Sequence, residues 1–260
     1  MDFQYAFVVA GLFVGFVVGL TGVGGGSLMT PILLAFGVSP SNAVGTDLLY
    51  AAITKMGGIH VHHKKSNINW RITVFLACGS VPAALLTLWL LHSSGLDTET
   101  VNKVIKKSLG WAMLFTAVAI IFKQKIMDYS HRNNVWVTRM TPSQQDIATV
   151  VIGLILGAVV TLTSIGAGAL GTVVLFLLYP LLPTVKLVGT EIAHAVPLTL
   201  VAGLGHASFG NVDWGLLLNL LIGSLPGIYI GSHLANRAAE KYMRPALAAM
   251  MVFAGTKLVL

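Results

Sequence analysis

Two acidic side chains stand inside apolar stretches of this sequence, each directly after a threonine: Asp47 follows Thr46, and Glu191 follows Thr190. A carboxylate in hydrocarbon is costly, and such residues usually belong to a substrate or proton path. His194 lies three positions after Glu191 and shares its face if the stretch is helical. We predict that Asp47, Glu191 and His194 serve coupling or gating. The alternatives are an Asp47 at headgroup level and a purely structural hydrogen bond between Glu191 and His194.

Two segments poor in side chains interrupt the apolar stretches, Gly22-Val-Gly-Gly-Gly26 and Ser164-Ile-Gly-Ala-Gly168. Hydrocarbon cannot hydrogen-bond their backbone groups, so these groups must face protein or a wet cavity. A short helix after each segment would offer free N–H groups and a positive dipole end, which together form an anion site without a buried cation. Close helix packing through small residues is the alternative. The residues predicted to bind the substrate are Thr21, Gly24, Gly25, Gly26, Ser27, Thr46, Thr163, Ser164, Gly166, Gly168 and Thr190.

Other kinds of chemistry fit these residues poorly. Glu191-x-x-His194 resembles a di-metal ligand pair, but such sites need further carboxylates and the chain has only 9 acidic residues, so we expect no metal. The glycines are not a nucleotide-binding loop, because no Lys-Ser/Thr follows them and no strand precedes them. No cofactor is expected. An intramembrane hydrolase using Ser27 or Ser164 with His194 is an alternative, but neither serine has a nucleophile context, and we predict that the protein is not an enzyme.

The composition predicts an integral membrane protein. Hydrophobic residues make up 55% of the chain and charged residues 10%, with a mean hydropathy of +0.83, whereas a soluble globule carries about 25% charged residues. The net charge of +7 comes mainly from loops, as the positive-inside rule predicts, so it indicates orientation and lipid contact rather than nucleic-acid binding. The single cysteine excludes an intrachain disulfide.

The sequence contains an internal duplication. Residues 11–28 recur as residues 153–170, identical at 10 of 18 positions, and Val44-Gly45-Thr46 returns as Val188-Gly189-Thr190. Duplicated hydrophobic units with matching Gly and Pro breaks are typical of secondary transporters, whose substrate site lies between the copies. We expect an all-α fold, a polytopic transmembrane bundle with a first repeat at 1–123, a polar linker at 124–145 and a second repeat at 146–260.

The orientation of the two repeats depends on the short helices. Residues 27–37 would reach only about 16 Å as a helix, half of a bilayer core, so the segment either completes a crossing with its glycines or is re-entrant. Counted as crossings, these segments give five per repeat and opposite orientations. The basic residues favour this inverted arrangement with the linker in the cytoplasm, when Lys55 is left out because it sits within a helix. Asn69-Trp70, Thr141-Pro142 and Asp213-Trp214 mark helix starts.

Four motifs of the first repeat resemble the TauE/SafE sulfite exporter family of bacterial and archaeal membrane proteins. They are Gly19-Leu-Thr-Gly-Val-Gly-Gly-Gly-Ser-Leu-x-x-Pro31, Ala43-Val-Gly-Thr46, Asn67-Ile-Asn-Trp70 and Gly79-Ser-x-Pro82, with echoes in the second half. The second half departs from the pattern at Gly171-Thr-Val173, where the proline is missing. The resemblance implies transport of sulfur-containing anions such as sulfite, thiosulfate or organosulfonates, often outward.

These inferences agree on one function. We expect a multi-pass transporter of the cell membrane whose partners are a small anionic substrate and the lipid bilayer. A homo-oligomer is left open, and a non-transporting membrane subunit is the remaining alternative class.

Overall fold

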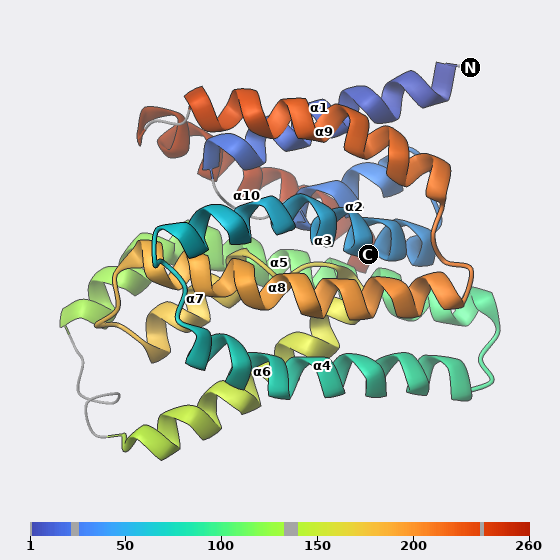
Figure 1. The fold of residues 1–260 in the computed structure, drawn as a ribbon. Helices are drawn as coiled ribbons and strands as arrows, with labels where there is room; N and C mark the ends of the chain where they lie inside the picture. The colour runs from blue at the N-terminus through green and yellow to red at the C-terminus, as the bar shows by residue number, and fades with distance from the viewer. Residues whose placement is uncertain (1, 22–25, 133–139, 235–236) are drawn as a thin grey trace.

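The computed structural model describes residues 2–21, 26–132, 140–234 and 237–260, and all regular structure within them is helical. The prediction of an all-α fold is therefore confirmed. Figure 1 shows the helices running roughly along one common direction. Their bounds are α1 Asp2–Thr21, α2 Gly26–Ala35, α3 Pro40–Lys64, α4 Trp70–Ser93, α5 Thr98–Arg132, α6 Pro142–Thr163, α7 Ala169–Leu178, α8 Thr184–Ser208, α9 Trp214–Leu234 and α10 Arg237–Val259.

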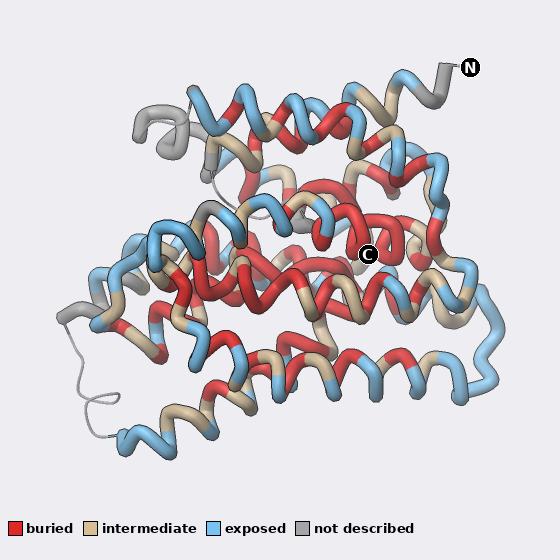
Figure 2. Tube along the Cα trace, viewed as in Figure 1, coloured by how far each residue is buried: buried red, intermediate tan, exposed pale blue. Residues whose placement is uncertain are grey.

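Within the described ranges, five helices are long and apolar enough to cross a membrane: Trp70–Ser93, Thr98–Ile126, Pro142–Thr163, Thr184–Ser208 and Trp214–His233. Three apolar helices are shorter, Tyr5–Leu20, Ala169–Leu178 and Pro245–Val259. Large apolar side chains such as Trp89, Phe115 and Tyr229 are exposed on the outside, while buried residues gather at the centre (Figure 2). An apolar exterior around a packed interior is what a lipid environment requires, and the protein is a multi-pass membrane protein.

The helix starts that the sequence marked are capped as expected. Asn69 Oδ1 accepts a hydrogen bond from the backbone N–H of Ile72 at 3.3 Å, and Asp213 Oδ1 accepts one from Leu216 at 2.9 Å. Thr141 forms a capping box with Gln144 at the start of α6. These caps fix where α4, α6 and α9 begin, and the prediction of these three starts is confirmed.

Part of the expected linker is helical. Residues 124–132, expected to belong to it, continue α5 without interruption as far as Arg132. The reason is that polar residues such as Gln124 and Lys125 are good helix formers, so a helix that leaves the apolar region need not stop there. The rest of the expected linker up to 139 lies outside the described residues, and α6 already begins at Pro142.

Closely packed helix pairs build the bundle, and glycines stand at their contacts. A Cβ atom on Gly15 of α1 would lie 2.4 Å from the Ser224 carbonyl oxygen of α9. A Cβ atom on Gly157 of α6 would lie 2.3 Å from the Ser80 carbonyl oxygen of α4. The pairs α1–α9 and α6–α4 thus approach backbone to backbone, as small residues allow in membranes. The long helices α3 and α8 pack together at the centre of the molecule (Figure 1).

Different helix ends meet at the two ends of the bundle. The end of α3, the end of α5 and the start of α8 lie together at the left of Figure 1, whereas the end of α4, the start of α5 and the end of α8 lie at the right. The left-hand connections carry Lys64, Lys65 and Lys186, and the first turns of α5 at the right carry Lys103 and Lys106. This arrangement is the one that five crossings per half would require, while the orientation in the membrane stays a prediction.

Candidate functional site

The second glycine-rich segment forms a sharp break between α6 and α7. Helix α6 ends at Thr163, Ser164 adopts the left-handed conformation with φ of 57°, and Gly166 has φ of 121°. Side chains other than hydrogen are strained at such a φ, which explains the glycine at 166. The Gly166 carbonyl then accepts hydrogen bonds from the backbone of Gly168 and Gly171 and so starts α7. The break lies inside the protein, because residues 163–168 are all buried.

Asp47 is completely buried on α3 and contacts the first short helix. Its Oδ2 atom accepts a hydrogen bond of 2.5 Å from the hydroxyl of Thr30 on α2. Ser164 of the second break lies beside the same carboxyl group without reaching standard hydrogen-bond geometry. The second oxygen, Oδ1, has no hydrogen-bond partner among the described residues. Asp47 therefore lies between α2 of the first half and the break of the second, buried within the protein.

Glu191 occupies a corresponding place on α8, against the second short helix. It is 3% exposed, and a Cβ atom on Gly171 of α7 would lie 3.2 Å from its Oε1 atom. Oε1 has no hydrogen-bond partner in the part of the chain that the structure describes. Each half thus brings one buried carboxyl group against its own short helix. Both carboxyl groups have free acceptor capacity, which a proton or a bound molecule could use.

His194 is buried near Glu191 but bonds to a different helix. Its Nε2 atom forms a hydrogen bond of 2.8 Å with the hydroxyl of Ser80 on α4. A direct hydrogen bond between His194 and Glu191, one of the structural alternatives, is not formed between these two described side chains. Nδ1 of His194 is buried without a partner among the described residues, so the ring has one nitrogen unused.

Lys55 is the functional candidate that the sequence interpretation missed. It lies on α3, is 8% exposed, and its ammonium group donates a hydrogen bond to the carbonyl of Ala167 in the second break. Its charge acts on Asp47, Glu191 and His194. On the sequence alone, Lys55 is left out of the charge count as a residue within a helix, and the expected anion site does not need a buried cation. The structure adds a buried cation beside the second break. The signal was visible in the sequence as a charge inside an apolar helix, as at Asp47.

A cavity of about 160 Å³ is lined by two of these groups, Lys55 and Glu191. Helices from both halves of the chain form its walls: α1 and α3 from the first half, and α7, α8 and α9 from the second. Gly168, which precedes the first residue of α7 and lacks a side-chain cap, lies at its edge. The lining residues are Val18, Thr54, Lys55, Gly58, Gly168, Thr172, Val188, Glu191, Ile192 and Ile228.

Thr46 and Thr190, both predicted to bind substrate, use their hydroxyl oxygens elsewhere. Thr46 Oγ1 accepts a hydrogen bond of 3.1 Å from the backbone N–H of Asp213. Thr190 Oγ1 accepts one of 2.9 Å from the backbone N–H of Asn69. Each threonine on a central helix therefore holds the start of a helix from the other half. Neither residue lines the central cavity.

The remaining predicted binding residues divide between the two breaks. Thr163 is buried, and its hydroxyl bonds locally to Val159 and Ile165, while the Ser164 hydroxyl has no hydrogen-bond partner among the described residues. Gly26 is the first residue of α2. The side chains of Thr21 and Ser27 are not described, and Gly24 and Gly25 lie outside the described residues.

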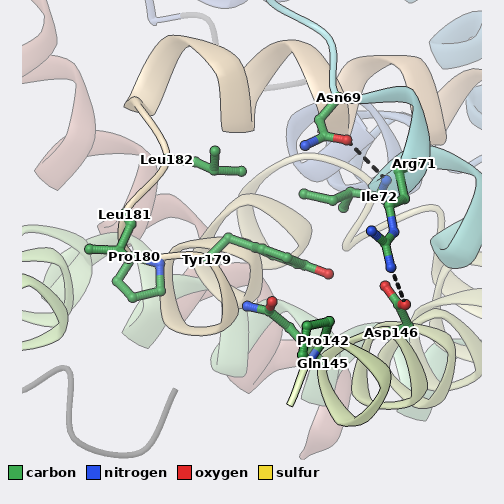
Figure 3. A pocket seen from close by; sticks show the side chains of 10 residues that line it. All are labelled: Asn69, Arg71, Ile72, Pro142, Gln145, Asp146, Tyr179, Pro180, Leu181 and Leu182. Carbon is green, nitrogen blue, oxygen red and sulfur yellow. Dashed lines mark hydrogen bonds and ion pairs between the residues drawn. The ribbon is translucent and has the colours of Figure 1, made fainter. Parts of the chain in front are cut away.

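Cavities also lie toward each end of the bundle. One of about 300 Å³ opens where α4 and α6 begin and α7 ends (Figure 3). An ion pair of 2.6 Å between Arg71 Nη2 and Asp146 Oδ2 crosses it, and Tyr179 points its hydroxyl into the same space. A cavity of about 230 Å³ toward the other end is lined by His206, which is fully buried and hydrogen-bonded through Nε2 to the Thr161 carbonyl at 2.9 Å. The structure therefore has one cavity near each end of the bundle in addition to the central one.

Metal chemistry has no support in the described ranges, which contain no group of three or more His, Cys, Asp or Glu side chains suited to hold an ion.

The position that corresponds to Lys55 by the 144-residue offset is Thr199, which is buried and donates its hydroxyl to the Ala195 carbonyl at 2.8 Å. The buried cation therefore has no counterpart in the second half.

Buried charged groups around a cavity between membrane helices are typical of a membrane transporter. The comparison with protein families agrees: residues 7–258 match the family described as sulfite exporter TauE/SafE. The chain belongs to the TauE/SafE sulfite exporter family of membrane transporters, and it is not an enzyme.

Relatives with similar length support this assignment. The chain is 41% identical over 253 residues to the probable membrane transporter protein YjnA of Bacillus subtilis, and the matched region covers 97% of this chain and 98% of the relative. It is 27% identical over 258 residues to the probable membrane transporter protein YdhB of the same organism, covering 94% and 96%. A relative from Methanocaldococcus jannaschii, the probable membrane transporter protein MJ0441, is 25% identical over 272 residues, covering 97% and 94%. No solved structure matches the chain.

Proposed function

We propose that this protein is a secondary transporter that exports small sulfur-containing anions such as sulfite, thiosulfate or organosulfonates. The observation that carries the proposal is the central cavity at the start of α7, enclosed by helices from both halves of the chain. The family name supports the sulfur chemistry of the substrate.

The start of α7 suits an anion. Gly168 offers no side-chain cap, so the first N–H groups of α7 and the positive end of its dipole are not neutralised by a side chain. Small oxyanions bind such helix starts through backbone N–H groups. The cavity beside it is about 160 Å³, and a water molecule takes about 30 Å³ of liquid volume, so an anion of four or five non-hydrogen atoms fits.

The two halves act as repeats of opposite orientation in this proposal. Helices α2 and α7 each have 10 residues, and α3 and α8 each have 25. The hydrogen bonds of Thr46 and Thr190 are reciprocal, because each joins a central helix to the helix start of the other half. A substrate between such repeats can be exposed to either side when one half rocks against the other. The buried carboxyl groups of Asp47 and Glu191 are the coupling groups.

Flux measurements in liposomes that contain only this protein test the proposal. We expect efflux of sulfite, thiosulfate or an alkyl sulfonate above the rate of protein-free liposomes, and slower efflux of phosphate and chloride. If none of the sulfur anions moves in either direction while another solute does, the proposed substrate class is wrong.

A further inference from the structure

We propose that the ammonium group of Lys55 is the charge partner of the transported anion, and that the site takes an oxyanion with a short apolar tail. This rests on the proposed function and specifies the ligand of the same cavity. It goes beyond the helix-end site because it adds a buried cation to it.

The first step of the argument is that Lys55 has donors left over. An ammonium group has three N–H donors, and the hydrogen bond that the structure gives Lys55 goes to the neutral carbonyl of Ala167. Among the described residues, no carboxylate oxygen lies within ion-pair distance of its Nζ atom. A buried charge is expensive unless it is paired, so an ammonium in this state is suited to receive an anion.

The second step is the shape of the cavity. Lys55 lines it together with Gly168, so an anion there meets the ammonium group and the start of α7 at once. Other parts of the wall are apolar, with Val18 from α1, Ile192 from α8 and Ile228 from α9. A polar end next to apolar walls suits an oxyanion that carries a short alkyl group, such as an alkyl sulfonate, better than it suits an oxyanion that is polar all round.

The third step is the balance of charge. Glu191 lines the cavity and Asp47 is buried on the same helix as Lys55. With both carboxyl groups ionised, the three side chains carry a net charge of −1, and without Lys55 they carry −2. The two carboxylates oppose anion binding, and Lys55 offsets one of their two negative charges. Removing Lys55 should therefore weaken anion binding, whereas neutralising Glu191 should strengthen it.

The experiment measures the binding of sulfite and methanesulfonate to the purified full-length protein by titration calorimetry. For Lys55→Met we expect a dissociation constant raised roughly ten- to hundredfold, because a charge-assisted hydrogen bond is lost. Lys55→Arg keeps the charge and should bind more tightly than Lys55→Met. Lys107→Met, an exposed lysine of α5, is the matched control and should bind as the unchanged protein does. Methanesulfonate should bind more tightly than sulfate, which has no apolar tail.

The variants separate a binding role from a structural one. Replacing a buried charge by an apolar side chain of similar length should leave the melting temperature of Lys55→Met unchanged or higher. Unchanged anion binding in Lys55→Met overturns the proposal. If Lys55→Met does not fold, Glu191→Gln decides: tighter anion binding supports the charge balance, and equal or weaker binding contradicts it. Binding of nitrate or phosphate through Lys55, with no sulfur anion bound, refutes the proposed function and leaves the role of Lys55 standing.

Discussion

At the scale of single residues, the proposed site is built from buried ionisable groups. Asp47, Lys55, Glu191 and His194 are all buried on two helices, α3 and α8, and Lys55 contacts the second break through the Ala167 carbonyl. The intramembrane positions of Asp47 and Glu191 already predicted a costly and therefore functional setting from the sequence. The partner of His194 could not be predicted, because Ser80 lies 114 positions away and only tertiary packing brings the two together.

Glu191→Gln tests whether this residue carries protons. Gln keeps the shape and one acceptor oxygen but cannot take up and release a proton. We expect the variant to bind the anion more tightly, as the charge balance around Lys55 requires, but to lose transport driven by a pH gradient, measured as sulfite flux into liposomes with an imposed gradient.

His194→Ala should give a weaker form of the same defect, since its imidazole bonds to Ser80 rather than to the carboxyl group. Substrate exchange at equal pH on both sides serves as the control and should persist in both variants. Full flux under the pH gradient in Glu191→Gln would show that coupling does not pass through this residue.

At the scale of helices, the sequence predicted the short elements well and the polar ones poorly. Glycines on one side and a turn on the other limited α2 and α7 to half a membrane, and both have 10 residues. The end of α5 was placed too early, because polarity marks the end of the apolar region and not the end of a helix. Lys55 was missed because basic residues in the sequence were used only to decide orientation. A lysine within an apolar helix was not considered as a possible site residue.

The glycine contacts between helices give a prediction at this scale. A Cβ atom on Gly15 or Gly157 would lie within 2.4 Å of a backbone oxygen that cannot move away easily. We expect Gly15→Val and Gly157→Val each to destabilise the protein by about 1–3 kcal/mol or more through overpacking, seen as a lower melting temperature in detergent.

The matched control is Gly57→Val on α3, where an added Cβ atom meets nothing within 4 Å. It should melt within a few degrees of the unchanged protein. Equal melting temperatures for all three variants would mean that the pairs α1–α9 and α6–α4 are looser than the structure shows.

At the scale of the whole molecule, the connections at the two ends of the bundle test the orientation of the halves. Single cysteines at Ser66 and Ser208 in a Cys78→Ser background should react with a membrane-impermeant thiol reagent from opposite sides, because both residues are exposed and lie at the ends of α3 and α8. The cytoplasmic side should be that of Ser66, as the basic Lys64 and Lys65 indicate.

Labelling of both cysteines from one side would contradict the inverted arrangement and make the glycine-rich segments re-entrant. A double cysteine variant labelled in intact and in opened cells provides the internal control for access. The membrane location could be predicted from the composition, and the helical fold from the long apolar stretches. The relative orientation of the two halves could be predicted only weakly, because it rested on a few charged residues in loops.

The replacement of Lys55 by Thr199 in the second half has a consequence for the history of the fold. A gene that doubles an inverted unit begins with two identical halves and therefore with two equivalent cavities, one on each side of the symmetry axis. A lysine at this position in one half alone means that the two halves differ in the charge they bring to the cavity. Under the repeat proposal, divergence after duplication has made two initially equivalent sites unequal at this position, so that the lysine comes from one half alone.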